Sequence, residues 1–259
     1  MAKLRRPSLE QVLAFCSDDP VKRVFLEDIA RRGIGRFLAL VNETDVEALC
    51  HFGANIVPAG RGCSAFSRSA LDSRARMIIG DEAAVGDLWE AARVQFPAPR
   101  HDRARQPVLE LRSMPQPGES GLRSALSTDL ELLVPACARA HQEELDVDPL
   151  LRDRDGFVRR TQMQITSGRS WLWEEGGRIL FKVEASAWTA STVQLQQVWT
   201  DPELRGQGYA RRGLRDLCRL LLARVPSVCL FVRPENERAL RLYEEVGMER
   251  IGYFRSIVF

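Results

Sequence analysis

A stretch rich in glycine and arginine, DPELRGQGYARRGL (residues 201–214), separates a predicted strand from a predicted helix. The first turn of a helix offers unpaired N–H groups and the positive end of the helix dipole, which together attract anions. Gly206 and Gly208 let the backbone approach an anion without an intervening Cβ. The spacing Arg205-x-x-Gly208-x-Ala210 differs from the P-loop and from the three-glycine dinucleotide fingerprint. The stretch therefore predicts a phosphate-binding turn, with a plain glycine turn as the alternative.

A second pair of chemically useful side chains, Asn236 and Tyr243, lies on the predicted helix NERALRLYEEV. Residues seven positions apart lie on one face of a helix, two turns from each other. A tyrosine with an ordinary pKa near 10 is protonated at neutral pH and can donate its proton to a reacting group. The alternative for Tyr243 is an aromatic ring packed on the inner helix face, with its hydroxyl bonded elsewhere.

In this order the two segments resemble the GNAT acetyltransferase superfamily. Residues 205–210 match that family's pyrophosphate loop, Gln/Arg-x-x-Gly-x-Gly/Ala. Residues 236–248 match its N-x-x-A-x-x-x-Y-x-x-x-G-F segment, with Met248 in place of the final phenylalanine. Further segments are similar to actinobacterial two-domain GNAT proteins with an N-terminal domain of unknown function: GANIVPAG, GDEAAVGDLWEAA, RARQPVLEL, EELDVDP, FKVEA and GYFRSIVF. The resemblance spans nearly the whole chain and names no acceptor substrate.

The resemblance implies a site for acetyl-coenzyme A, the acyl donor, and no metal. In the family the coenzyme lies between two splayed parallel strands, the first of which corresponds here to residues 193–199. We expect main-chain contacts from this strand, pyrophosphate contacts from the N–H groups of the turn, and added charge from Arg205, Arg211 and Arg212. The expected coenzyme-binding residues are Val198, Trp199, Thr200, Arg205, Gly206, Gln207, Gly208, Tyr209, Ala210, Arg211 and Asn236.

The resemblance also implies that Tyr243 is the general acid that protonates the departing thiolate, while the attacking amine needs a base or a water chain. Glu184, in the predicted strand FKVEA, is the expected base, because a carboxylate buried there would have a raised pKa. A solvent-facing Glu184 is the alternative. Glu143, Glu144 and His141, near the end of a predicted helix, are further candidates. We expect a backbone N–H of residues 198–200 to hold the oxyanion.

The amino-acid composition limits the classes of partner that we expect for this chain. The 259 residues carry a formal net charge of only +2, which gives no support for a nucleic-acid or membrane partner. Six scattered cysteines form no C-x-x-C pair, which favours buried free thiols over a metal site. No long apolar run and no cleavable leader is recognisable, so we expect a cytoplasmic protein. The oligomeric state, monomer or homodimer, stays open.

The elements that must position these residues form an α/β (α+β) chain. We expect a GNAT fold over residues 121–259, with a mixed central sheet flanked by helices, after a smaller α/β domain over residues 1–112. The segment RSMPQPGES has no periodic apolar pattern and predicts a linker over residues 113–120. In the first domain RFLALV predicts a strand, and DVEALCHF (residues 45–52) predicts a helix.

Two further expectations concern glycine and arginine patterns. Counting from Arg32 and Arg61, phenylalanine stands at the sixth position of the loop pattern, so the first domain is expected to be a degenerate GNAT-like half that binds no coenzyme. After the loop, Arg211, Arg215 and Arg219 are spaced four apart, and we expect Arg215 and Arg219 to form an ordinary solvated helix face.

The function that follows is transfer of an acetyl group from acetyl-coenzyme A to a primary amine of a small molecule, peptide or protein, by direct attack in a ternary complex. The alternative is a non-catalytic module of the same fold that binds an acyl-coenzyme A as a sensor or interaction platform. Tyr243 and the intact loop favour catalysis.

Overall fold

The computed structural model describes residues 2–43 and 45–259. The strands are β1 (Lys3–Arg5), β2 (Arg36–Asn42), β3 (Asp45–Phe52), β4 (Ile56–Gly60), β5 (Met77–Asp81), β6 (His101–Leu111), β7 (Arg123–Ser124), β8 (Ser170–Glu175), β9 (Arg178–Trp188), β10 (Thr192–Thr200), β11 (Ser227–Phe231) and β12 (Glu249–Val258). The helices are α1 (Leu9–Ser17), α2 (Val24–Arg31), α3 (Ser67–Leu71), α4 (Glu82–Ala92), α5 (Leu130–Leu145), α6 (Pro149–Thr166), α7 (Tyr209–Leu222) and α8 (Glu237–Val246), with short 3₁₀ turns η1 (Cys63–Phe66), η2 (Ser127–Asp129) and η3 (Pro202–Leu204). Within the part of the chain described, no helix is long and apolar enough to cross a membrane.

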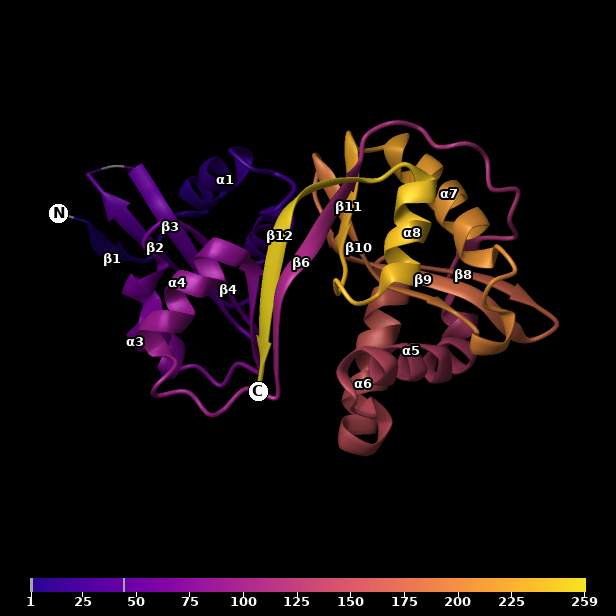
Figure 1. Cartoon of the computed structure of the whole chain (residues 1–259), viewed down its shortest axis with the longest axis horizontal. Coiled ribbons are helices and arrows are strands. Elements are labelled where there is room, and N and C mark those ends of the chain that lie inside the picture. Colours follow the sequence, from indigo (N-terminus) through magenta and orange to yellow (C-terminus); the bar gives the residue numbers. More distant parts are fainter. Residues whose placement is uncertain (1, 44) are drawn as a thin grey trace.

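The strands join in one sheet, in the order β1-β2-β3-β4-β5-β12-β6-β11-β10-β9-β8-β7. The last strand of the N-terminal half, β6, pairs with β11 of the C-terminal half, and Cys229 lies opposite Glu110. The last strand of the chain, β12, returns to pair with β5, and Ser256 lies opposite Ile79. β6 and β12 also pair with each other and bridge the two lobes (Figure 1). Each half therefore completes the sheet of the other.

The two halves repeat one order of elements. In the N-terminal half β4 leads through η1 and α3 to β5, α4 and β6, and in the C-terminal half β10 leads through η3 and α7 to β11, α8 and β12. β4 pairs with β5 in parallel, as β10 pairs with β11. This repeat supports the expectation of a GNAT-like N-terminal half.

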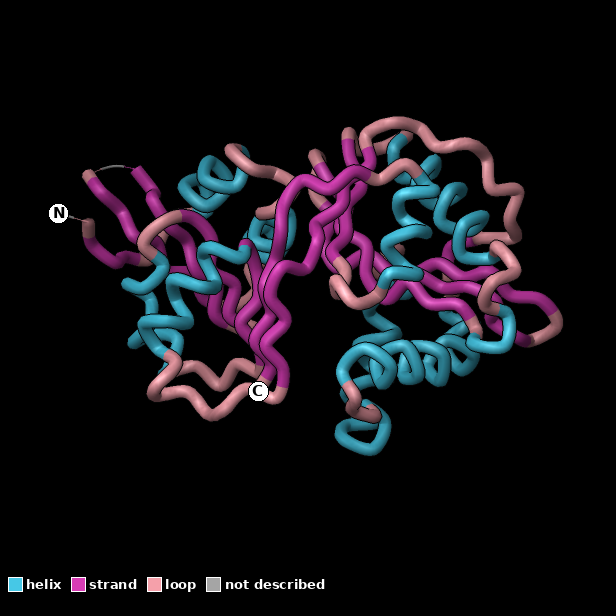
Figure 2. The backbone as a smooth tube through the Cα atoms, viewed as in Figure 1, coloured by secondary structure: helices cyan, strands magenta, loops and turns pink. Residues whose placement is uncertain are grey.

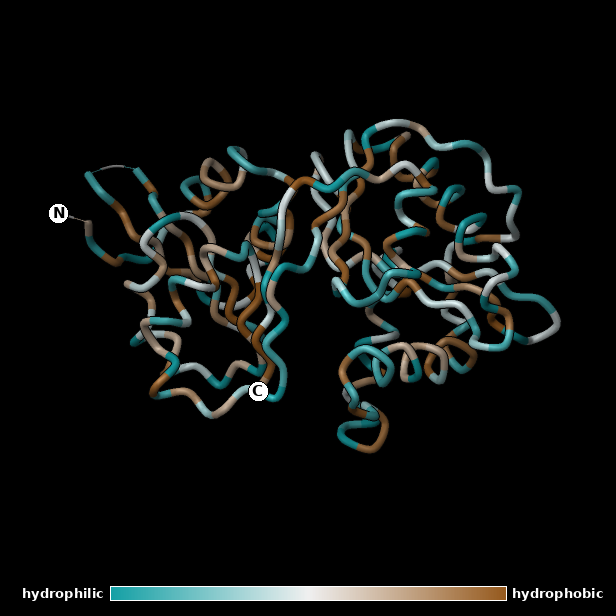
Figure 3. The backbone as a smooth tube through the Cα atoms, in the orientation of Figure 1, coloured by the Kyte–Doolittle hydropathy of each residue, from teal (hydrophilic) through white to brown (hydrophobic). Residues whose placement is uncertain are grey.

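Helices cover both faces of the sheet in the C-terminal half (Figure 2). Side chains of β8 alternate between the faces: Trp171 and Trp173 belong to the core under α7, whereas Leu172 belongs to the core under α5 and α6. Figure 3 shows hydrophobic residues concentrated along the strands between these layers. Burying one large apolar side chain contributes about 1.5–3 kcal/mol. The two cores thus hold β10 and α7, the elements at either end of the glycine-rich loop, in place.

Residues 45–52 form the strand β3, so the expectation of a helix there is wrong. β3 pairs with β2 on one side and β4 on the other, and Leu49 lies opposite both Ala39 and Ala59. Every residue from Ala48 to Phe52 is buried. A strand buried on both faces has a continuous apolar run instead of an alternating one, and such a run cannot be distinguished from a buried helix by periodicity.

The segment between β6 and β7, residues 112–122, contains no helix or strand, yet it is tied to α7. The Asp216 carboxylate accepts the N–H groups of Gly118 and Ser120 at 2.7 and 2.8 Å. A Cβ at Gly118 would lie only 1.9 Å from a backbone oxygen of α7, so the close approach requires glycine. The domain and linker bounds expected from the sequence stay a prediction.

Arg215 and Arg219 are half-buried and bonded, so the expectation of a solvated helix face is wrong for both. Arg219 donates to Pro115 O at 2.8 Å and so holds the segment between β6 and β7. Arg215 donates to Glu245 O at 3.1 Å, at the end of α8. Helical spacing alone did not reveal these partners, because both belong to segments distant in the sequence.

Candidate active site

Strands β10 and β11 separate partway along their length. Their parallel pairing covers only Thr192–Gln194 of β10 and Ser227–Cys229 of β11. Beyond these residues β10 stays paired with β9, while β11 stays paired with β6. The two strands therefore splay into a V-shaped opening, the arrangement that the family resemblance implies.

A bulge in β10 lies next to this opening. Between the pairs Gln196–Glu184 and Trp199–Lys182, β10 has two residues where β9 has one. Gln197, inside the bulge, has φ 52°, in the left-handed region that few residues other than glycine adopt. Because a bulge leaves an extra residue out of the ladder, a backbone unit of β10 is released here from pairing with β9.

A cavity of about 630 Å³, which we call the loop cavity, lies along the glycine-rich loop and α8. Gly206 and Gly208 have φ 87° and 86°, and a Cβ at either would lie 3.9 Å from the nearest atom, a guanidinium nitrogen. Arg212 N–H bonds to Gly208 O at 3.0 Å. The N–H groups of residues 209–211 precede this bond and have no helical acceptor. The loop therefore offers open space and unpaired backbone donors.

The structure brings the predicted coenzyme-binding residues together around the loop cavity. Asn236 is also the N-cap of α8, since its Oδ1 accepts the Ala239 N–H at 3.2 Å. Its side-chain NH₂ takes no part in that bond. The predicted residues that line the loop cavity are Val198, Trp199, Thr200, Arg205, Gly206, Gln207, Gly208, Tyr209, Ala210, Arg211, Asn236 and Tyr243.

Positive charge predominates in the loop cavity. Arg205 pairs with Glu143 at 2.6 Å, and Arg211 pairs with Glu245 at 3.3 Å. Two more arginines, on α8, were not found from the sequence because they lie outside the loop pattern. The charged lining residues are Glu143, Arg205, Arg211, Arg238, Arg241 and Glu245. Arginines thus exceed acids, which suits a polyanionic ligand.

Arg212 does not line the loop cavity, contrary to the expectation that it adds charge to a pyrophosphate site. Its guanidinium lies over the Trp173 ring, 4.8 Å from the centroid. It also donates to Gly118 O at 3.0 Å and to Glu119 O. Arg212 therefore holds the segment between β6 and β7 against the C-terminal half.

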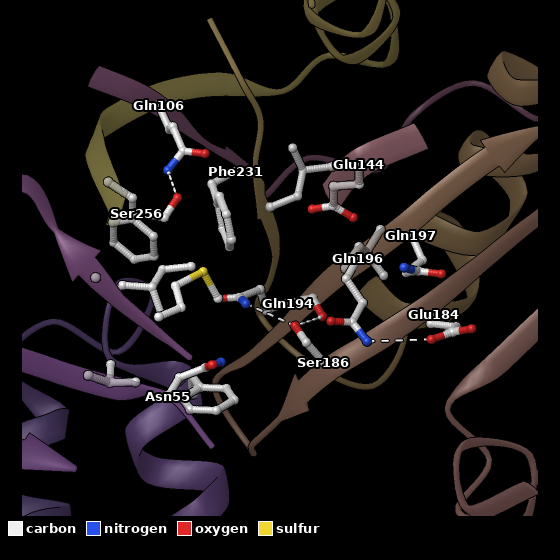
Figure 4. Close-up of a pocket in the computed structure, with 18 of the residues that line it drawn as sticks. Asn55, Gln106, Glu144, Glu184, Ser186, Gln194, Gln196, Gln197, Phe231 and Ser256 are labelled. Atoms are coloured by element: carbon white, nitrogen blue, oxygen red, sulfur yellow. Dashed lines mark hydrogen bonds between the residues drawn. The ribbon is translucent and has the colours of Figure 1, made fainter. Parts of the chain in front are cut away.

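A larger cavity of about 1120 Å³, which we call the interlobe cavity, is lined by both halves. Figure 4 shows Asn55, Gln106 and Ser256 on one side of it and Gln194 and Gln196 on the other. The residues that line both the loop cavity and the interlobe cavity are Glu143, Val198, Trp199, Asn236 and Tyr243. The two cavities therefore meet at these residues.

Tyr243 stands at this junction with its hydroxyl uncommitted. The side chain is 6% exposed and packs in the core under α7 and α8. Within residues 2–43 and 45–259 its hydroxyl has no hydrogen-bond partner. Burial, together with the negative charge of Glu144, raises the pKa of Tyr243. The phenol is therefore protonated at neutral pH and available as a donor.

Glu144 is a carboxylate of the interlobe cavity, near Tyr243. It lies at the end of α5 and is exposed within the cavity, among the side chains of Figure 4. The surrounding walls withdraw it from bulk water, and this burial raises its pKa in spite of the nearby guanidinium groups of Arg103 and Arg233. His141 also lines the cavity, and burial lowers its pKa, so the imidazole is neutral at neutral pH.

Glu184 is buried, but the expectation that its pKa is raised is wrong. Burial alone would raise the pKa, but the Lys182 ammonium, 2.9 Å away, outweighs this and holds the pKa below its ordinary value. Lys182 also donates to the Cys137 thiol at 3.0 Å. Cys137 and the other five cysteines are free and buried, as expected. A lysine in the strand FKVEA could have signalled this pair.

In the N-terminal half, the turn that corresponds to the loop is closed by the chain itself. Gly62 has φ 79° and is the N-cap of η1, as Gly208 is the N-cap of α7. The Asp87 carboxylate of α4 accepts the Ser64 N–H of this turn at 3.0 Å. The Asp87 carboxylate therefore already accepts a hydrogen bond from a backbone N–H that an external anion would need. This arrangement supports the expectation that the N-terminal half binds no coenzyme.

Two family models match the chain. Residues 35–133 match the model described as a domain of unknown function (DUF4081), and residues 135–248 match that of the acetyltransferase (GNAT) family. A relative, the N-alpha-acetyltransferase RimI of Mycobacterium tuberculosis, is 42% identical over 62 residues, which are 24% of this chain and 38% of the relative. The chain thus spans well under half of that relative's length.

Solved structures share the fold over nearly the whole chain. A GCN5-related N-acetyltransferase from Sphaerobacter thermophilus has a TM-score of 0.63 at 15% identity, covering 99% of this chain and 95% of its own. A tandem GNAT protein from the clavulanic acid biosynthesis pathway has a TM-score of 0.58 at 10% identity, covering 100% and 98%. These matches confirm the mixed α/β fold. Residues 135–248 are thus an acetyltransferase domain of the GNAT family, which follows a domain of unknown function within one continuous sheet.

Proposed function

We propose that the protein transfers an acetyl group from acetyl-coenzyme A to a primary amine, by direct attack while donor and acceptor are bound together. The observation that carries the proposal is the meeting of the loop cavity and the interlobe cavity at Tyr243, Val198 and Asn236. A donor in one cavity and an acceptor in the other would touch at this junction. The name of the M. tuberculosis relative, an N-alpha-acetyltransferase, supports an amine as the acceptor.

The loop cavity fits the coenzyme. The N–H groups of residues 209–211, with Arg205 and Arg211, would hold the pyrophosphate. The unpaired edge of β10 at residues 198–200 would pair with the amide groups of the pantetheine arm, since β11 has separated from it. When bound, the coenzyme supplies the acetyl thioester.

Two side chains at the junction would move the protons. Glu144 would take a proton from the acceptor amine as its nitrogen bonds to the acetyl carbon, and its raised pKa suits this role. Tyr243 would give its proton to the sulfur as the carbon–sulfur bond breaks. A backbone N–H near the bulge of β10 would hold the carbonyl oxygen. Glu184 suits the base role less, because it is ion-paired with Lys182.

The test compares wild type with Gly208→Glu and Tyr243→Phe. In Gly208→Glu we expect loss of acetyl-coenzyme A binding by calorimetry, because a carboxylate would enter the anion site. Gly177→Glu is the matched control, since Gly177 has a similar φ of 78° and nothing near its Cβ, so the backbone strain is alike. Coenzyme binding that is equal in wild type and Gly208→Glu contradicts the coenzyme site.

For Tyr243→Phe we expect unchanged coenzyme binding and a fall in kcat of about 10²–10⁴-fold, measured as thiol release over a panel of amines and peptides. Folding should be unaffected, because the hydroxyl that is removed has no hydrogen-bond partner among the residues that the structure describes. If wild type binds the coenzyme but acetylates no amine faster than Tyr243→Phe does, catalysis is refuted and a sensor of the same fold takes its place.

A further inference from the structure

Two arginines meet at the C-terminal end of α5, one from each half of the chain. Arg103, on β6, donates to Glu144 O at 2.8 Å. Arg233, in the turn after β11, donates to Glu143 O at 3.4 Å. Both arginines line the interlobe cavity, and Glu143 also lines the loop cavity. The guanidinium groups therefore lie on adjacent carbonyls next to the junction where the acceptor amine would react.

Both guanidinium groups lie apart from the carboxylates of the described part of the chain. Among the residues described, no carboxylate oxygen lies within 4.0 Å of Arg103 or Arg233. The acids around Arg103 are Glu144, Asp146 and Glu235, which act on it only at longer range. A guanidinium has five N–H donors, so a carbonyl oxygen of α5 leaves most of the donors of each arginine for another acceptor.

Two like charges in this position repel each other. Burial and then the charge of Arg233 lower the pKa of Arg103. The negative end of the α5 dipole offsets part of this repulsion, which is the purely structural role the two side chains could have. A full negative charge between the guanidinium groups would offset more, through charge-assisted hydrogen bonds to both.

The other cations of the interlobe cavity are differently placed. Arg61 is exposed, and the remaining four face carboxylates of the chain. These pairs are Lys22 with Asp19 and Asp81, Arg23 with Asp18, Arg32 with Asp28, and Arg160 with Asp153. Within residues 2–43 and 45–259, Arg103 and Arg233 are therefore the half-buried cations of the cavity that no carboxylate neutralises.

We propose that Arg103 and Arg233 bind a negatively charged oxygen group, a carboxylate or a phosphate, that is part of the acceptor amine. The proposal rests on the proposed function and specifies its substrate class. Glu144, whose carbonyl Arg103 holds, would accept a hydrogen bond from the neutral amine group of the same molecule. The acceptor would thus be an amine with an anionic group a few bonds away, bound at both ends.

The test uses pairs of amines that differ only in the anionic group: glycine and glycinamide, β-alanine and its amide, 4-aminobutyrate and its amide, phosphoethanolamine and ethanolamine. We expect wild type to prefer the anionic member of at least one pair by about 10-fold or more in kcat/KM, the size of one hydrogen bond to a charged group. Arg103→Gln and Arg233→Gln should each reduce this preference about 10-fold, chiefly through KM. Carboxylate and phosphate pairs show which anion the site takes.

Controls separate binding from folding. Arg160→Gln removes another arginine of the cavity, one paired with Asp153, and should keep the preference. Arg103→Lys retains the charge and a donor for Glu144 O, and should restore part of the preference for the anionic amine. If the role of Arg103 were purely structural, its substitution would alter thermal unfolding without altering that preference. Equal rates for both members of every pair in wild type, or a preference that persists in both glutamine variants, overturn the proposal.

If no amine is acetylated, the anion site is tested by calorimetry with phosphoethanolamine and β-alanine on the coenzyme A-loaded protein. Binding that is lost in Arg103→Gln and Arg233→Gln but kept in Arg160→Gln retains the anion site and refutes the transferase. Absence of binding by every anionic amine overturns the anion site, whatever the fate of the transferase.

Discussion

At the scale of single residues, two carboxylates of the interlobe cavity have opposite environments. Glu184 pairs with Lys182, which holds its pKa low and keeps its charge engaged. Glu144 is open to the cavity and its pKa is raised by burial. A base works best when its pKa approaches the working pH, so the difference between the two environments supports the proposal of Glu144 as the base.

We expect kcat/KM to rise with pH through an ionisation above the ordinary glutamate pKa of about 4.3. The rate should rise with pH because the proposed base, Glu144, would act in its deprotonated form, and its pKa is raised. Glu144→Gln should abolish this acidic limb of the pH profile, the rise of kcat/KM with pH, and lower the rate about 10²–10⁴-fold. Glu143→Gln is the neighbouring control and should keep the limb, because Glu143 is engaged by Arg205. An unchanged acidic limb in Glu144→Gln contradicts the assignment.

The sequence predicted some site residues and could not predict others. The loop and Tyr243 could be found because each lies within a short continuous segment, residues 205–210 and 236–248, that resembles a pattern of the family. Arg103 could not, because it reaches the site through the pairing of β6 with β11 and β12, strands more than a hundred residues later. The pKa of Glu184 differs from the prediction because Lys182, two residues earlier in the same strand, lies on the same face and is buried beside it.

At the scale of elements, one buried lysine joins three of them. Lys182, on β9, donates to Glu184 of the same strand, to Cys137 of α5 at 3.0 Å and to Gln197 in the bulge of β10 at 3.2 Å. Its side chain is 0% exposed. Because the bulge borders the V-shaped opening, this lysine helps set the shape of the strand edge that would meet the coenzyme.

Lys182→Met should lower the free energy of unfolding at pH 7 by about 3–5 kcal/mol, because Glu184 becomes an unpaired buried charge. In wild type the contribution of Glu184 is present above its unfolded pKa and lost as pH falls through its lowered folded pKa. In Lys182→Met the pKa of Glu184 rises, so the deficit should shrink as pH falls. Urea unfolding at several pH values measures both trends.

The double variant Lys182→Met/Glu184→Leu is the control for this prediction. It replaces the whole pair by apolar side chains and should recover most of the lost stability. A single variant with wild-type stability, or one whose deficit grows on acidification, contradicts the account of the pair.

At the scale of the whole molecule, the exchange of β6 and β12 makes the halves depend on each other. β6 covers the edge of β11, and β12 covers the edge of β5. The order of helices and strands could largely be predicted from the sequence. The exchange of β6 and β12 could not be predicted. The residues of β12 could pair with the edge of any apolar strand, and nothing local specifies which strand they pair with.

We expect fragments 1–112 and 113–259 to fail to fold alone, because each leaves a strand edge unpaired and a core open. Circular dichroism and solubility of the separately expressed fragments measure this. The matched control is the full chain cut after folding between residues 112 and 122, where no strand is interrupted, and it should stay assembled. A cooperative unfolding transition in isolated 113–259 would refute the dependence.

The pairing of β6 with β12 also bears on how an acceptor enters. Many two-lobed enzymes close on their substrate by bending at a flexible hinge. Here the lobes are joined by a hydrogen-bonded ladder that runs from Glu249–Glu110 to Val258–His101, and bending across it would break backbone bonds. The width of the gap between the two lobes is therefore fixed before the substrate binds. Selection among acceptors would then rest on which molecules fit a pre-formed gap, and not on which ones induce it to shut.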